Sequence, residues 1–296
     1  MWQYHLMKGI SKIICLLPKM INDYIGDFLG IVAWIVMPTW RKNLAIDQVR
    51  QCLSLPYNQA EKIAKNSATK YGKMLVEVLA FPLLTKESIK NKVVFHDEDK
   101  KLFDSLLAEG KGLILATAHF GNWEIGAALA LYGYPLVAVV QKLRNDAMDK
   151  FINEYRSMIG EHVVYKAGVL EMARMLGKGN VVGLLYDQDA GKDGVVVDFL
   201  GRPSSCPKGP AALARLKDAP IVVMLLNNKD DGTYEISLSE KIVVSKSNDR
   251  ESDIKETTQV LMKKLEVAIR EQPEMWFWLH NRWKVDKQRY KTKKQA

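Results

Sequence analysis

The sequence predicts an α/β fold with a largely parallel central sheet flanked by helices, preceded by N-terminal membrane-associated helices. From residue 112 onward, short apolar runs alternate with helical stretches, as in α/β domains. The apolar runs hold few polar residues, which is typical of parallel strands buried on both faces. The first 40 residues are dense in large apolar side chains. We therefore divide the chain into a membrane-associated helical segment over residues 1–40, a main domain over 41–284 and a basic tail over 285–296.

The composition is that of a globular protein with ample material for a core. The chain has 296 residues, of which 48% are hydrophobic and 26% are charged. Its cysteines, Cys15, Cys52 and Cys206, are widely separated and show no CxxC spacing, so we expect neither a disulfide framework nor a zinc site, and a reducing compartment. The net charge is +9, of which residues 282–296 carry +6. No nucleic-acid-binding motif accompanies this tail, so a membrane surface is the favoured partner, with a plain soluble terminus as the alternative.

Two apolar runs, at residues 13–17 and 28–37, predict helices in the N-terminal segment. The second run is too short to cross a bilayer, which requires about 20 apolar residues. It better fits an interfacial or half-inserted helix. Trp34 and Trp40 suit the headgroup level, and the basic pair at 41–42 favours the cytoplasmic side. The alternative is a pair of amphipathic helices packed on the main domain itself.

The main domain is expected to begin with a helical pattern over residues 45–84. The glycine-rich stretch 177–183 has the wrong spacing for a nucleotide-binding loop and is predicted to be a turn. Substrates of such sheets bind at the carboxyl ends of the strands. The further elements are expected as strand 112–116, helix 125–131, strand 136–140, helix 148–159, strand 162–165, helix 169–176, strand 181–185, helix 211–216, strand 221–226, strand 233–238 and helix 254–269.

A histidine and an acidic residue five positions apart follow the first predicted strand. His119 is expected in the strand-to-helix turn and Glu124 in the first turn of the helix, where their side chains can meet. A carboxylate bonded to one imidazole nitrogen leaves the other nitrogen free to take a proton from a hydroxyl. Gly121 allows close approach of backbone, and Asn122 can cap the helix that begins at Trp123. We predict a general base oriented by Glu124; the alternative is a structural histidine at a turn.

Polar residues elsewhere add candidates to this site. Arg156 lies off the apolar face of its predicted helix, where a guanidinium could stabilise an oxyanion or hold a phosphate. Asp187 and Asp189, which end the strand at 181–185, could bind a sugar or orient Arg156. Arg202 and Lys208 precede a helix start, where either phosphate binding or a plain surface loop is expected.

A metal site is the less favoured explanation of the acidic residues that surround this region. Asp187, Asp189, Asp193 and Asp198 follow one another closely but show no recognisable ligand spacing. We therefore expect no metal.

The stretch 119–124 resembles the HxxxxD/E motif of glycerolipid-type acyltransferases, in the HxGNWE form of the lipid A late acyltransferase family. The resemblance extends over residues 41–284, making that segment the acyltransferase domain of a glycerolipid acyltransferase-like fold. Further matches are Arg41 with the Asn-Leu at 43–44, the helix segment 156–160, the DQ motif at 187–188, the stretch 198–203 and the ending PExWxWxHxRWK at 273–284.

The resemblance implies transfer of a fatty acyl chain from acyl carrier protein to a hydroxyl of a lipid A precursor, without a cofactor, at the cytoplasmic face of the bacterial inner membrane. Since the chain lacks a GxSxG turn, we expect direct transfer without an acyl-enzyme. The alternatives are an acyltransferase for another glycolipid such as a mannosylated phospholipid, a non-catalytic membrane-associated relative and a metal-dependent hydrolase. The catalytic residues implied are His119, Glu124 and Arg156; those for oxyanion or substrate binding are Gly121, Asn122, Trp123, Asp187, Gln188, Asp189, Arg202 and Lys208.

Overall fold

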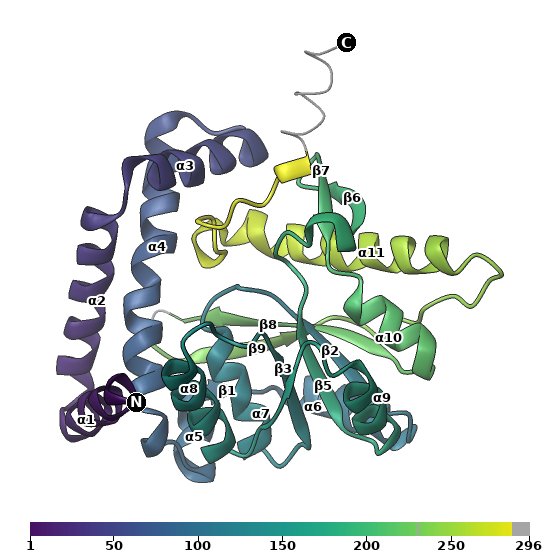
Figure 1. Cartoon of the computed structure of the whole chain (residues 1–296), viewed down its shortest axis with the longest axis horizontal. Coiled ribbons are helices and arrows are strands. Elements are labelled where there is room, and N and C mark those ends of the chain that lie inside the picture. The colour runs from purple at the N-terminus through teal and green to yellow at the C-terminus, as the bar shows by residue number, and fades with distance from the viewer. Residues whose placement is uncertain (230, 286–296) are drawn as a thin grey trace.

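A computed structural model describes residues 1–229 and 231–285, and its centre is a seven-stranded sheet (Figure 1). The strand order is β1-β9-β8-β2-β5-β3-β4. Every neighbouring pair is parallel except β8 and β9. The largely parallel α/β sheet is therefore confirmed. Its strands are β1 (Val93–Val94), β2 (Leu113–Thr117), β3 (Leu136–Val140), β4 (His162–Tyr165), β5 (Val181–Leu185), β8 (Ile221–Asn228) and β9 (Tyr234–Leu238).

Helices cover both faces of this sheet, because alternate residues of its central strands point to opposite sides. Leu113 and Leu115 of β2 pack in one buried cluster with residues of α6 (Asp97–Ala108), α7 (Ala128–Leu131) and α8 (Asp146–Met158). Ile114 and Ala116 pack in the other cluster, with α9 (Val169–Gly177), α10 (Gly209–Lys217) and α11 (Arg250–Glu271). Shorter elements join them: α5 (Lys86–Lys92) and the 3-10 turns η1 (Phe81–Leu83), η2 (Trp123–Ala127), η3 (Gly191–Asp193) and η4 (Pro273–Met275).

A second, two-stranded sheet and the aromatic C-terminal segment lie beside α11. β6 (Val195–Phe199) and β7 (Arg202–Cys206) form an antiparallel hairpin, which the sequence patterns did not predict. The ring of Phe199 stacks on Trp283, and Trp276 and Trp278 are buried with them. These aromatic residues of the ending at 273–284 therefore contribute to packing.

The N-terminal helices are α1 (Trp2–Leu16), α2 (Lys19–Val36), α3 (Thr39–Leu53) and α4 (Tyr57–Leu79). The continuous helical pattern predicted over 45–84 is interrupted, since Ser54 adopts a left-handed conformation and Pro56 precedes α4. Helices α2 and α4 pack backbone to backbone: a Cβ at Gly30 would lie 2.1 Å from the Thr69 carbonyl oxygen. Within the described residues no single helix is long and apolar enough to span a membrane; α2 and α3 pass that test only together, bent by 102°.

Candidate functional site

A histidine and a buried aspartate meet at the carboxyl edge of the central sheet. β2 and β5 are parallel neighbours with Thr117 opposite Leu185, and His119 and Asp187 each follow two residues later. The Nδ1 atom of His119 lies 2.8 Å from Oδ1 of Asp187. The backbone N–H of His119 donates to Oδ2 of the same carboxylate at 3.1 Å, and so does Nε1–H of Trp276 at 2.9 Å. Four groups from three parts of the chain therefore form one fixed unit.

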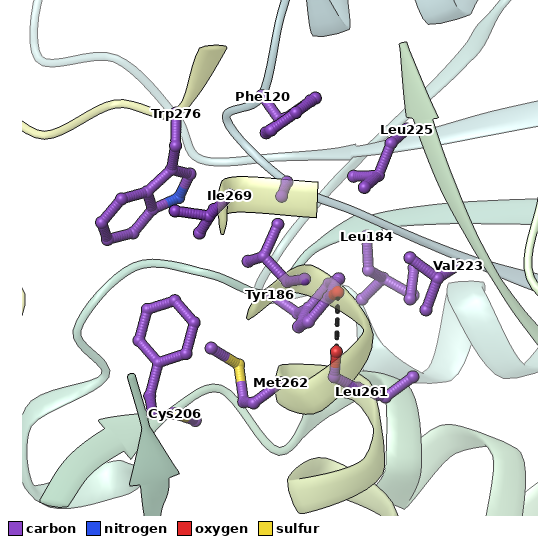
Figure 2. Packing of buried hydrophobic residues seen from close by; sticks show 14 of the residues in the cluster. Phe120, Leu184, Tyr186, Cys206, Val223, Leu225, Leu261, Met262, Ile269 and Trp276 are labelled. Carbon is purple, nitrogen blue, oxygen red and sulfur yellow. Dashed lines mark hydrogen bonds between the residues drawn. The ribbon is translucent and has the colours of Figure 1, made fainter. Parts of the chain in front are cut away.

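The core beneath the site holds these residues in place (Figure 2). Phe120 and Tyr186, the neighbours of the site residues along the chain, are both buried in it. The Tyr186 hydroxyl donates to the Leu261 carbonyl oxygen of α11 at 3.0 Å. Because Phe120 and Tyr186 are anchored in packed surroundings, the adjacent polar side chains have little freedom to separate.

The opposite charges of Asp187 and protonated His119 stabilise each other. Burial alone would raise the pKa of the Asp187 carboxyl, but the His119 charge and hydrogen bonds from His119 and Trp276 hold it below its usual value. Burial alone would lower the pKa of His119, but the charge and hydrogen bond of Asp187 outweigh it and raise that pKa. An ionised carboxylate only accepts hydrogen bonds, so Nδ1 of His119 carries the proton and Nε2 carries the lone pair.

The lone pair of His119 faces the side chain of Gln188. Nε2 lies 3.2 Å from Nε2 of Gln188, whose side-chain amide donates to it. The ring of Trp123 packs against the imidazole with centroids 4.7 Å apart, and Phe277 lies at 6.2 Å. The His119 side chain keeps 16% of its surface exposed. The imidazole is therefore largely enclosed, with the Gln188 amide at the nitrogen that carries the lone pair.

The prediction that Glu124 orients His119 is wrong. Glu124 instead accepts two hydrogen bonds from Arg156, Nε–H at 3.1 Å and an Nη2–H at 2.6 Å, and a third from Nε1–H of Trp123. Burial would lower the pKa of Arg156, but the Glu124 charge raises it, so the pair stays ionised. Asp187 approaches from the neighbouring strand and takes the place at Nδ1 that local spacing had given to Glu124.

Two predicted roles in the glycine turn also need correction. Gly121 does bring backbone close, because its φ is +59° and a Cβ would lie 2.1 Å from the Leu226 carbonyl oxygen. Its amide, however, donates to the Met275 carbonyl oxygen at 2.9 Å and is therefore not available to an oxyanion. Asn122 sits at the N-cap position of η2 without a capping hydrogen bond, and its side chain donates to Glu77.

The acidic loop after β5 is held by the C-terminal segment. Asp189 contacts Lys284 at 3.0 Å, and its backbone N–H donates to Nε2 of His280 at 3.0 Å. Burial and the charges of Lys284 and Arg282 lower the pKa of His280 to about 4, so it remains a neutral acceptor. The suggestion that Asp187 or Asp189 orients Arg156 is wrong, since their described partners are other residues.

The remaining candidate residues, Arg202 and Lys208, are not part of the site around His119 and Asp187. The Arg202 guanidinium lies over the Trp283 ring at 4.8 Å. Lys208 is exposed at the start of α10, where its phosphate-binding role stays a prediction. Within residues 1–229 and 231–285, no group of three or more His, Cys, Asp or Glu side chains is placed to hold a metal ion. Residues 286–296 of the predicted basic tail lie outside the described residues.

The sequence patterns gave no role to several residues that complete the site. They are His280 and Trp276, whose indole binds Asp187; Gln188 was a candidate for oxyanion or substrate binding, but its contact with the imidazole was not predicted. The available signal for the His119–Asp187 pair was positional, because each residue follows a predicted parallel strand within three residues of its end.

The fold and the site define an α/β protein that pairs a histidine with a buried aspartate at the carboxyl edge of its sheet. The model of the bacterial lipid A biosynthesis acyltransferase family matches residues 1–285, so the chain belongs to that family. Its members act on glycolipids, and this class of activity is accordingly assigned to the chain.

Individual relatives differ in the acceptor that their names specify. The chain is 25% identical over 252 residues to a phosphatidylinositol mannoside acyltransferase of Mycolicibacterium smegmatis, covering 83% of this chain and 79% of the relative. It is 28% identical over 182 residues to the lipid A biosynthesis lauroyltransferase of Escherichia coli, covering 60% and 58%. It is 22% identical over 283 residues to the palmitoleoyltransferase of the same organism, covering 94% and 89%.

Proposed function

We propose that the chain moves a fatty acyl group from acyl carrier protein to a hydroxyl of a lipid A precursor or a similar glycolipid. The observation that carries the proposal is the His119–Asp187 pair at the carboxyl edge of the sheet, the edge where substrates of such sheets bind. Membership of the acyltransferase family supports the reaction class. The net charge of +9 favours an acidic carrier protein and an anionic lipid surface as partners.

The reaction proceeds by general-base catalysis without an acyl-enzyme. Nε2 of His119 takes the proton of the acceptor hydroxyl while its oxygen attacks the thioester carbonyl carbon. Asp187 stabilises the imidazolium that forms. The new C–O bond forms, the C–S bond breaks, and the leaving thiolate takes the proton back from Nε2. The side-chain amide of Gln188 gives up its place at Nε2 to the acceptor hydroxyl.

Arg156 has a positioning role in this mechanism. Its guanidinium donates through Nε and Nη2 to the two carboxylate oxygens of Glu124, which also accepts from the Trp123 indole. Trp123 in turn packs against the His119 ring. The ion pair therefore helps to hold Trp123 against the His119 ring.

The N-terminal helices provide the attachment to the membrane in this proposal. Tyr24, Phe28, Ile31 and Ile35 of α2 are exposed and follow spacings of four, three and four, so they share one face. This face lies opposite the glycines that pack against α4, and among the described residues nothing covers it. An apolar helix face of this kind suits the headgroup boundary of a bilayer. We place the enzyme at the cytoplasmic face of the bacterial inner membrane.

Vesicle co-sedimentation tests the attachment. Phe28→Glu with Ile35→Glu should reduce binding to anionic phospholipid vesicles more than tenfold, because two charges then enter the apolar layer. Val267→Glu, on an exposed position of α11, is the matched control. Equal binding of both variants would refute the placement of α2 in the bilayer.

Product analysis tests the reaction. The full chain in phospholipid nanodiscs is incubated with acyl carrier protein or coenzyme A bearing a fatty acyl chain, and with a lipid A precursor or a phosphatidylinositol mannoside. Mass spectrometry should show one added acyl group with the carrier-protein donor. His119→Ala should abolish the product, whereas His162→Ala, an exposed histidine, should retain it. Absence of product with every pair of substrates, or product from His119→Ala, would overturn the proposal.

A further inference from the structure

An open surface groove lies at the same edge of the sheet, two strands away from His119. It has a volume of about 480 Å³ and runs along α8 beside the carboxyl ends of β3 and β4. We call it the α8 cavity. Its volume is in the range of small-molecule sites, about 300–1,000 Å³. Residues that line it include Lys142, Asp149, Lys150, Asn153, Ser157 and Tyr165.

The floor of the α8 cavity is fixed by one buried carboxylate. Asp149 is 5% exposed and accepts hydrogen bonds from the Leu143 N–H at 2.7 Å and the Tyr165 hydroxyl at 2.5 Å. Nδ2 of Asn153 lies 3.3 Å from Asp149 and from the Tyr165 hydroxyl. The polar groups that a ligand would meet are therefore already oriented, which reduces the entropic cost of binding.

The charges around the α8 cavity compensate each other. Lys142 contacts Asp146 at 3.3 Å, and Lys8 of α1 contacts Glu154 at 2.8 Å. The cavity therefore offers interspersed donors and acceptors without an excess of cations. A phosphate needs such an excess, whereas the hydroxyls of an uncharged sugar need both donors and acceptors.

The position of the α8 cavity connects the catalytic residues with the exposed N-terminal helix. Asn153 accepts from Arg156 at 3.3 Å, and Arg156 binds Glu124 beside Trp123. On the other side, Lys150 lies over the Tyr4 ring of α1 at 4.8 Å. Helix α1 exposes Trp2 and Leu6. A ligand in the α8 cavity thus has the Arg156–Glu124 ion pair on one side and the exposed apolar residues of α1 on the other.

We propose that the α8 cavity binds an uncharged hexose ring in the head group of the glycolipid acceptor. The proposal rests on the glycolipid transferase function and adds the place where the acceptor is recognised. A bound ring keeps the head group at the substrate edge while its lipid chains extend toward α1, and another hydroxyl of the head group reaches His119.

Saturation-transfer NMR on the full chain in detergent micelles tests the site without turnover. The probes are methyl α-mannoside and methyl N-acetyl-β-glucosaminide, with inorganic phosphate as competitor. Ser157→Trp fills the cavity from an exposed helix position and removes no buried contact; Ser105→Trp, on an exposed position of α6, is the matched control. The same variants are assayed for acyl transfer.

The expected result is a sugar signal in the wild type and Ser105→Trp that falls at least fivefold in Ser157→Trp. The KM for the glycolipid should rise about tenfold in Ser157→Trp, with kcat within threefold of the wild type. An unchanged signal and KM in Ser157→Trp would overturn the sugar site, as would a signal abolished by phosphate. A wild type that binds the sugars but transfers no acyl group would refute the transferase while leaving the sugar site standing.

Discussion

Replacing Asp187 by Asn should inactivate the enzyme through the tautomer of His119. On the Oδ2 side, the Asp187 carboxylate faces two donors, the His119 amide and the Trp276 indole; on the Oδ1 side it faces Nδ1 of His119. The asparagine therefore places its carbonyl oxygen toward the two donors and its NH2 toward Nδ1. Nδ1 must then accept, and the proton moves to Nε2, where no lone pair is left for the acceptor hydroxyl.

The expected loss is about 10³- to 10⁴-fold in kcat, equivalent to roughly 4–5.5 kcal/mol of transition-state stabilisation. The assay follows transfer of a radiolabelled acyl group into glycolipid at saturating donor. Asp47→Asn, an exposed position on α3, is the control and should retain full activity. Thermal unfolding of each variant shows whether it is folded. A folded Asp187→Asn enzyme within threefold of the wild type would refute the role of Asp187.

Three further predictions concern the groups around the base. Glu124→Ala leaves the Arg156 guanidinium buried without its carboxylate, so the free energy of unfolding measured with urea should fall by about 3 kcal/mol. The double variant with Arg156→Met should regain part of this stability. A double variant with no recovery would contradict the ion pair. Gln188→Leu removes the donor that favours neutral His119, so the acid limb of the pH profile of kcat/KM should move to higher pH. An acid limb at the same pH as in the wild type would contradict the contact between Gln188 and His119. His280 has a lowered pKa of about 4, so its contribution to stability is present above pH ~6.5 and is lost as pH falls toward 4. His280→Asn should reduce this loss of stability by about 1–2 kcal/mol after allowance for solvent screening. The same pH dependence of unfolding in the variant and the wild type would contradict the lowered pKa.

The fold was predictable because its signals are local. Apolar runs such as 112–116 and 181–185 are buried strands in the structure, and the alternation with helices required a parallel sheet. The break after Ser54 was missed because a single left-handed residue before Leu55 and Pro56 ends α3 within an otherwise helical pattern. The β6–β7 hairpin was missed although Leu200 and Gly201, both with positive φ, form its turn.

The sequence predicted the position of His119 in a turn after a strand, but the partner that it predicted for the imidazole was wrong. His119 is identified by its turn, but Asp187 lies 68 residues further along the chain. Only the pairing of β2 with β5 brings the two together, and a sequence pattern does not contain that register. The α8 cavity has the same origin, since Lys142 and Tyr165 follow different strands and meet only through the sheet.

The position of the imidazole proton tests the central claim most directly. With ¹⁵N-labelled histidine there are five imidazoles to resolve, and His119→Gln assigns the relevant one. We predict that His119 at high pH carries its proton on Nδ1, and that Glu124→Gln leaves this tautomer unchanged whereas Asp187→Asn moves the proton to Nε2. A wild-type His119 protonated on Nε2, or a tautomer that responds to Glu124 and not to Asp187, would contradict it.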